Sequence, residues 1–208
     1  MTLEIWLTFV LASTALLVLP GPTILLVLSY ALTQGRRVAI ASALGVATGD
    51  LLAMSLSMIG LGALLLTSAF AFAVLKWLGA AYLLWLGFRM LRNAGNASPL
   101  LDKPRGETPL KVYRDLATVT ALNPKSNTFF VAFVPQFLTA DAAFAPQATI
   151  LIATFVTIAC LNALVFALAA NHMRGLITRP LALTWLTRAG GTALIAMALL
   201  TATLRRHS

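Results

Sequence analysis

The sequence predicts an all-α integral membrane protein with six transmembrane helices, arranged as two inverted three-helix repeats in which helices 1 and 4 are broken. Three observations favour this fold class. The chain is 60% hydrophobic and 10% charged, whereas soluble domains contain about 25% charged residues. Apolar runs long enough to cross a bilayer, at about 20 residues each, alternate with short polar segments. Proline interrupts the first and the fourth of these runs.

The apolar runs form two groups of three. They cover roughly residues 4–31, 38–66 and 70–91 in the first half, and roughly 116–138, 147–170 and 185–204 in the second. Between the halves, residues 92–114 are rich in proline, glycine and charge, which is typical of a loop. The sequence therefore predicts a first repeat over residues 1–91, a cytoplasmic connecting loop over 92–114 and a second repeat over 115–208.

Basic residues gather on one side of the predicted membrane. The segments after the first, third and fifth apolar runs carry Lys and Arg, whereas the N-terminus and the segments after the second and fourth runs carry none. The tail is the exception, because Arg205 and Arg206 follow the sixth apolar run and lie on the other predicted side. An excess of Lys and Arg marks the cytoplasmic side, so both termini are predicted to face outward. The net charge of +9 is then accounted for by membrane orientation, and no nucleic-acid partner is predicted.

Two proline-containing stretches break the apolar runs at matching places in the two halves. Leu19-Pro20-Gly21-Pro22 aligns with Leu122-Asn123-Pro124-Lys125. Proline removes a backbone donor and clashes with the preceding turn, so each stretch should interrupt its helix inside the membrane. Broken backbone at that depth must face protein or a water-filled cavity, and paired breaks of this kind indicate a transporter's binding site. The predicted helix breaks and hinges are Pro20, Gly21, Pro22 and Pro124.

Two ionisable residues are predicted deep in the bilayer. Asp50 lies about twelve residues into its run, or ~18 Å along a helix, where a carboxylate costs at least roughly 2.5–3.5 kcal/mol. Lys125 lies about ten residues inside Asp115, or ~15 Å, too deep for its stem to reach the headgroups. For both residues we favour a functional role over a purely structural one, and we predict that Asp50, Lys125 and the neighbouring Asn123 bind the substrate or the coupling ion.

For Asn162, Gly45 and Gly49, contact between helices is favoured over binding of a ligand. Asn162 in the fifth run occupies roughly the place of Asp50 in the second. It is a further candidate ligand, although an interhelical hydrogen bond is the favoured interpretation. Gly45 and Gly49 precede Asp50 with the spacing that lets another helix pack closely, and packing is what we expect of them.

The remaining reactive residue types do not form a recognisable site. Cys160 is the single cysteine, and the two histidines, His172 and His207, lie at the ends of predicted segments. No metal site and no cofactor are predicted, because soft metals need clustered thiol or imidazole ligands. The sequence also lacks a Ser/His/Asp or Cys/His arrangement and a phosphate-binding loop, so an enzyme is not predicted.

The motifs taken together resemble the lysine exporter/homoserine-threonine resistance (LysE/RhtB) family. The resemblance is carried by Leu19-Pro20-Gly21-Pro22, the stretch from Gly45 to Asp50, Lys76-x-x-Gly79-Ala80-x-Tyr82-Leu83-x-x-x-Gly87, and Asn123-Pro124-Lys125-x-x-x-Phe129-Phe130-x-x-x-Pro135-Gln136-Phe137. These motifs span the first two thirds of the chain. The resemblance implies a multi-pass exporter of amino acids or their derivatives in the bacterial inner membrane, powered by an ion gradient. It does not fix the substrate, since members with these motifs export basic, neutral or sulfur-containing amino acids.

The sequence therefore predicts a secondary active exporter of an amino acid or close derivative, coupled to an ion and most simply to the proton. Both termini would be periplasmic. Asp50 would bind either the substrate ammonium or the coupling proton, while the backbone at the two breaks would bind the carboxylate. The partners are then the amino acid, the coupling ion and the lipid bilayer, and the sequence leaves a homo-oligomer open. The alternatives are a channel or an exporter of another small solute or cation.

The pattern of basic residues makes a testable prediction of orientation. In a Cys160→Ala background, single cysteines at Ser68 and Ala140 should react with an impermeant thiol reagent added to intact cells, because both positions lie in outward-facing segments. A cysteine at Ala97 should react only after the membrane is permeabilised. The reverse labelling pattern would invert the orientation assigned to each half.

Overall fold

The computed structural model describes residues 1–19, 21–67, 69–94, 106–139, 142–177 and 180–203. In these ranges the chain forms α-helices and short 3-10 helices, without a β-strand. The predicted all-α class is therefore confirmed. The predicted hinge residue Pro20 lies outside the described residues, as do the labelling positions Ser68, Ala97 and Ala140.

The helices follow one another in two comparable series. The first series is α1 (Leu3–Val18), α2 (Pro22–Gln34), the 3-10 helix η1 (Gly35–Val38), α3 (Ala39–Thr67) and α4 (Ala69–Arg92). The second is α5 (Pro109–Ala121), α6 (Pro124–Ala132), the 3-10 helix η3 (Val134–Phe137), α7 (Phe144–Ile177) and α8 (Pro180–Thr203). Each series thus contains two short helices in succession followed by two long ones.

In each pair of short helices, the second helix begins at a proline. Pro22 and Pro124 occupy the first turn of α2 and α6, where the fixed φ and the missing N–H of proline are tolerated. Gly21 and Asn123 are the N-caps. The two helix starts therefore pair Pro22 with Pro124, whereas the sequence alignment of the halves pairs Pro22 with Lys125. The register differs by one residue because the proline itself fixes where each helix begins.

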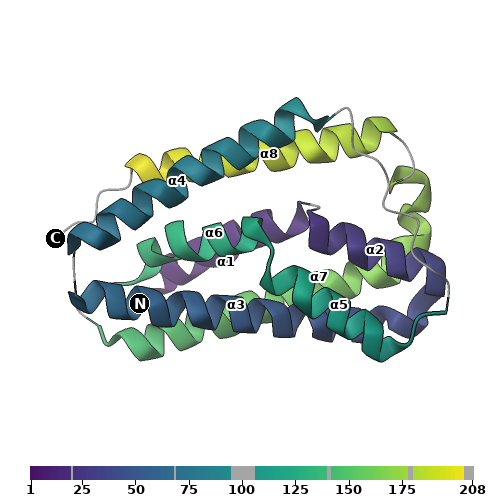
Figure 1. Cartoon of the computed structure of the whole chain (residues 1–208), viewed down its shortest axis with the longest axis horizontal. Helices are drawn as coiled ribbons and strands as arrows, with labels where there is room; N and C mark the ends of the chain where they lie inside the picture. The colour runs from purple at the N-terminus through teal and green to yellow at the C-terminus, as the bar shows by residue number, and fades with distance from the viewer. Residues whose placement is uncertain (20, 68, 95–105, 140–141, 178–179, 204–208) are drawn as a thin grey trace.

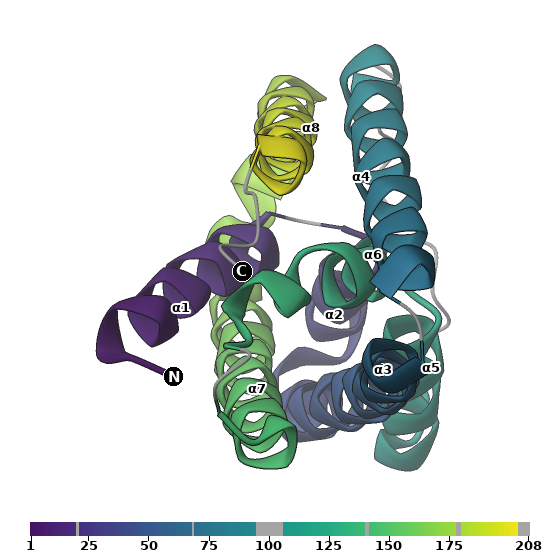
Figure 2. The ribbon, with the colours of Figure 1, turned by 90° about the vertical axis from the view of Figure 1, so that its left-hand side faces the viewer.

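The long helices run roughly side by side along the molecule (Figure 1). Viewed along that direction, α2 lies in the middle of α3, α5, α6 and α7, while α4 and α8 lie above this group (Figure 2). The most extensive packing joins α3 to α5 and α7, and α4 to α8. The two interrupted helices therefore meet in the interior of the molecule, surrounded by longer helices.

Two helical stretches within the described residues are long and apolar enough to cross a membrane. They are Pro22–Gly62, with a mean hydropathy of 1.6, and Phe144–Ala170, with a mean hydropathy of 2.4. Leu3–Val18 is a shorter apolar helix. The arrangement in six spans stays a prediction.

Glycines allow α3 to approach α5 closely. A Cβ atom added at Gly49 would lie 2.6 Å from the carbonyl oxygen of Ala117 and 2.7 Å from Cβ of Thr120. At Gly45 an added Cβ would lie 2.6 Å from the carbonyl oxygen of Tyr113. No larger residue fits at either position without moving backbone, so the packing role predicted for these two glycines is confirmed.

The α3–α5 contact gives a stability prediction. Gly49→Ala should lower the free energy of unfolding by roughly 1–3 kcal/mol, the usual cost of overpacking, because its new methyl group meets backbone. Gly60→Ala is the matched control on the same helix, since nothing lies within 4 Å of an added Cβ there. The control should be neutral or slightly stabilising, as alanine favours helix over glycine. Thermal unfolding of the detergent-solubilised proteins measures both, and equal unfolding temperatures would contradict the close approach of the helices.

Candidate functional site

A small cavity lies where α1 gives way to α2 and α5 gives way to α6. Its lining includes the predicted residues Gly21, Asp50, Asn123, Lys125 and Asn162. These residues come from both interrupted helices and from α3 and α7, so the fold brings together residues more than one hundred positions apart. The centre of a water molecule can move through about 20 Å³ of the cavity, which is room for about one water molecule. The cavity is too small in this conformation to hold an amino acid.

Lys125 binds the end of α1 rather than an acidic side chain. Its Nζ donates hydrogen bonds of 2.9 Å to the carbonyl oxygens of both Leu16 and Leu19. The side chain is buried, with 7% of the residue exposed. At its other end the Lys125 backbone N–H donates to Oδ1 of Asn123, 3.0 Å away, which caps α6. Lys125 therefore joins the start of α6 to the end of α1.

The sequence explains why these carbonyl oxygens need a donor. In an α-helix the carbonyl of residue 16 would accept from the N–H of residue 20, and residue 20 is a proline, which has no N–H. The last carbonyls of a helix also carry the negative end of its dipole. An ammonium group is well suited to this place. The proline four residues after Leu16 therefore predicts that the carbonyl of Leu16 lacks its helical partner.

Asn162 binds the same helix end from α7. Its Nδ2 donates a 3.0 Å hydrogen bond to the carbonyl oxygen of Leu17. This is the interhelical hydrogen bond that the sequence favours for Asn162. Asn162 and Lys125 therefore bind adjacent carbonyls at the end of α1, from two different helices.

Asp50 lines the same cavity, and 1% of the residue is exposed. Its Oδ1 atom has no hydrogen-bond partner among the described residues. Asp50 and Lys125 line the same cavity without forming an ion pair, and the ion pairs found in the described part of the chain are those of Lys111. Buried polar atoms normally have a hydrogen-bond partner, so the Asp50 carboxyl can accept a donor from a molecule in the cavity that it lines.

Thr23 links the two interrupted helices and was missed by the sequence analysis. Its Oγ1 accepts a 3.1 Å hydrogen bond from Nδ2 of Asn123 and lies 3.4 Å from the donating Oγ1 of Thr120. It occupies in α2 the position that Lys125 occupies in α6, which the one-residue shift in register had hidden.

The start of α2 also lies at the cavity, and the first N–H groups of a helix have no partner within it. Gly21 is the N-cap and has no side chain to bond the first turn of the helix. The N–H of Leu25 donates to the carbonyl oxygen of Gly21, which is the first backbone hydrogen bond of α2. The N–H groups of Thr23 and Ile24 come before it, and both residues line the cavity. An uncapped helix start of this kind favours an anion.

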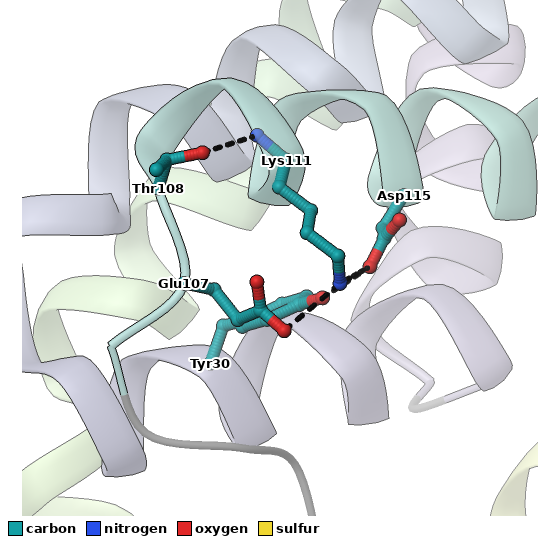
Figure 3. A network of polar contacts seen from close by, with 5 residues as sticks. All are labelled: Tyr30, Glu107, Thr108, Lys111 and Asp115. Carbon is teal, nitrogen blue, oxygen red and sulfur yellow. Dashed lines mark hydrogen bonds and ion pairs between the residues drawn. The ribbon is translucent and has the colours of Figure 1, made fainter.

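A polar network joins α2 to α5 on one side of the cavity (Figure 3). The Tyr30 hydroxyl, fully buried, donates to Oδ2 of Asp115. Nζ of Lys111 lies 2.9 Å from Oε1 of Glu107 and 3.6 Å from Oδ2 of Asp115, and the hydrogen bond to Glu107 raises the pKa of Lys111. Tyr30 follows the first residue of α2 by eight positions, or ~12 Å along the helix. The network therefore holds α2 against α5 about two turns from the cavity.

Aromatic rings pack on the other side of the cavity. The rings of Phe130 and Phe155 are 4.8 Å apart, and those of Phe129 and Phe133 are 5.2 Å apart. Phe9 joins this cluster from α1, with its ring 5.2 Å from that of Phe137. The helices that carry the cavity residues are thus joined by an apolar cluster at Phe129 and by the polar network at Tyr30.

Two interrupted helices whose ends meet at a buried, charged cavity define a class of protein, the membrane transporters. Comparison with known proteins agrees with this class. The chain belongs to the LysE type translocator family, whose sequence profile matches residues 14–205. The resemblance seen in the sequence is therefore confirmed, and the protein is a membrane transport protein rather than an enzyme.

Individual relatives cover much or all of the chain. A homoserine/homoserine lactone efflux protein of Salmonella typhimurium is 32% identical over 99% of this chain and 99% of its own length. A leucine efflux protein of Klebsiella pneumoniae is 31% identical over 66% of this chain and 65% of its own length. An uncharacterized membrane protein of Vibrio cholerae is 30% identical over 98% of both chains. No solved structure matches the chain.

The polar network gives a second stability prediction. Tyr30→Phe removes a hydrogen bond to a charged acceptor and should lower the free energy of unfolding by roughly 1–3 kcal/mol. Tyr113→Phe is the matched control, because its hydroxyl lies 3.2 Å from the uncharged Oγ1 of Thr48 and should contribute about 0.5–1.5 kcal/mol. Thermal unfolding in detergent compares them. A Tyr30→Phe protein as stable as wild type would show that the network does not hold α2 against α5.

Proposed function

We propose that the protein is a secondary active exporter of an amino acid or close derivative, driven by an ion gradient and in the simplest case by protons. The observation that carries the proposal is the buried carboxyl of Asp50, whose Oδ1 has no partner in the described residues. It lies at the meeting point of two helix breaks, beside the buried ammonium of Lys125. Ionisable groups inside membrane helices mark substrate and ion pathways.

The chemistry of the cavity supports an amino acid as substrate. An amino acid presents a carboxylate and an ammonium on one carbon atom. The cavity is lined by the uncapped start of α2 and the Lys125 side chain, which can bind an anion, and by the Asp50 carboxyl, which can bind a cation. The carbonyls of Leu16 and Leu19, which Lys125 binds, are further cation-binding groups at the end of α1. The relatives named as efflux proteins for homoserine, homoserine lactone and leucine favour the same class of substrate.

Two roles of Asp50 are compatible with this geometry. As a carboxylate it would attract the substrate ammonium. As a proton carrier it would bind a proton from one side of the membrane and release it on the other, since its oxygen is free to do so. We assign Asp50 to one of these two roles, and Lys125, Asn123 and Asn162 to shaping the same site.

Export requires the helices around the cavity to move. Because about 20 Å³ holds no more than about one water molecule, the described conformation leaves no room for an amino acid at the site. Gly21, Pro22 and Pro124, together with Pro20, are the proposed hinges, since helix breaks separate the segments that must move. Opening would break either the Tyr30–Asp115 network or the aromatic cluster, according to the side exposed.

We also propose the six-span arrangement of two inverted repeats, residues 1–91 and 115–208, joined by a cytoplasmic connection at 92–114. The predicted loop is shorter than the sequence suggested, because α5 already begins at Pro109. An inverted repeat relates equivalent helices by a two-fold axis. Under the proposed equivalence, α3 corresponds to α7 and α4 to α8, and each of these pairs packs together, as helices beside such an axis must. Both termini are then periplasmic, in the inner membrane of a bacterium.

Transport into inverted membrane vesicles tests the proposal. Labelled homoserine and leucine, within a panel of amino acids, should accumulate in vesicles containing the protein only when an ion gradient is imposed. A proton gradient is the first to try. Equilibration without accumulation would indicate a channel instead. Absence of transport for every amino acid under every gradient would overturn the substrate class.

Asp50→Asn should abolish gradient-driven accumulation, reducing it at least about tenfold, because the amide has neither the charge nor the titratable proton. Glu4→Gln is the matched control, an exposed acid with the same substitution. Exchange of labelled for unlabelled substrate separates the two roles. If exchange survives while accumulation is lost, Asp50 carries the proton; if both are lost, it binds the ammonium. Normal accumulation by Asp50→Asn would exclude both roles.

A further inference from the structure

The carbonyl oxygens at the end of α1 already hold an ammonium group, that of Lys125. Nζ of Lys125 is 2.9 Å from the carbonyl oxygens of Leu16 and Leu19. Two acceptors at that distance around one buried ammonium form a defined cation site. Gly21 lies against the same side chain, since a Cβ added there would lie 3.4 Å from Nζ. The α-ammonium of an amino acid has the same hydrogen-bonding group as the lysine side chain.

The geometry points to these carbonyls as the subsite for the substrate's ammonium, with Lys125 as an internal occupant that the substrate displaces. The released Lys125 side chain then binds the substrate's carboxylate. This inference rests on the proposed function, because it takes the substrate to be an amino acid. The ligand class that it names is a primary ammonium, and its site is the pair of carbonyls of Leu16 and Leu19, next to the cavity that Lys125 lines.

The exchange leaves both ammonium groups and the substrate carboxylate with a partner. Before it, the carbonyls at the end of α1 bind the lysine ammonium. After it, they bind the substrate ammonium, and the lysine ammonium binds the substrate carboxylate. Without displacement, a buried zwitterion would place a second ammonium beside one already bound, and an unpaired buried charge is strongly unfavourable. The exchange therefore explains why a lysine at this position faces carbonyls and not Asp50.

Neighbouring contacts keep the site in place while Lys125 moves. Asn162 holds the carbonyl of Leu17, between the two carbonyls of the site, through a hydrogen bond of 3.0 Å. The backbone N–H of Lys125 remains fixed by Asn123, so only the flexible side chain has to swing. The end of α1 keeps its shape whichever ammonium it binds.

The inference predicts opposite effects of one substitution on two related ligands. Lys125→Met removes the internal competitor and the carboxylate partner together. Homoserine lactone keeps the α-ammonium but has no carboxylate, so it should bind Lys125→Met at least about fivefold more tightly than it binds wild type. Homoserine has both groups and should bind the variant at least about tenfold more weakly. If Lys125 served only the carboxylate, the lactone would bind both proteins equally; if it served only to hold α1, both ligands would bind the variant more weakly.

Binding is measured by equilibrium dialysis of the labelled ligands with detergent-solubilised full-length protein, at a mildly acidic pH where the lactone amine is protonated. Arg37→Met is the control, since that exposed basic residue of η1 does not line the cavity. The double variant Lys125→Met/Asp50→Asn tests the carbonyls themselves, because a gain for the lactone that disappears there would assign the ammonium to Asp50 alone. If Lys125→Met does not fold, Lys125→Gln replaces it, because its amide keeps a neutral donor for the carbonyls. The lactone should again bind the variant more tightly than wild type, and homoserine more weakly.

Ethylammonium separates this inference from the proposed function. It is a small primary ammonium with no amino-acid character, and it should raise the unfolding temperature of Lys125→Met by filling the site, with little effect on wild type or Arg37→Met. Stabilisation by ethylammonium without any binding of homoserine or leucine would retain the cation site and overturn the amino-acid substrate. Unchanged or weaker lactone binding by a folded Lys125→Met, without stabilisation by ethylammonium, would overturn the inference.

Discussion

The hydrogen bonds between the Lys125 ammonium and the carbonyls of Leu16 and Leu19 are the contacts on which the centre of the molecule depends. A helix that ends inside an apolar interior leaves its last carbonyls without donors, and each costs several kcal/mol if it stays unpaired there. Here the side chains of Lys125 in α6 and Asn162 in α7 donate hydrogen bonds to these carbonyls. The break after α1, the start of α6 and the middle of α7 are thereby held at one point, and the cavity forms beside it.

The two halves contribute different chemistry to this point. The first half supplies the acceptors at the end of α1, the uncapped start of α2 and the carboxyl of Asp50. The second half supplies the donors, Lys125 and Asn162, and its own break is capped by Asn123. The side chains of the site are therefore asymmetric, since the carboxyl comes from the first half and the ammonium and amide donors come from the second.

The surroundings of the cavity combine a rigid frame with contacts that can separate. Backbone atoms of α3 and α5 meet at Gly45 and Gly49, where no side chain intervenes, so these helices have little freedom to slide past each other. The network at Tyr30 is polar and consists of a few side-chain contacts, and the aromatic cluster at Phe129 consists of ring contacts between α1, α6, η3 and α7. Side-chain contacts of this kind can break and form again while the glycine-packed frame stays intact.

Local sequence determined the helical class, the two breaks and the depth of Asp50 and Lys125. These features follow from composition, from the missing N–H of proline and from the spacing of charges along an apolar run, all of which act on neighbouring residues. Tertiary structure alone decided the partners. Lys125 binds carbonyls of residues more than one hundred positions away, Asn123 binds Thr23, and Tyr30 binds Asp115. The sequence placed the substrate carboxylate near Lys125, but it did not reveal that this ammonium is already held by α1. The reason is physical: backbone chemistry fixes where a helix breaks, whereas the packing of the other helices fixes what meets the broken end.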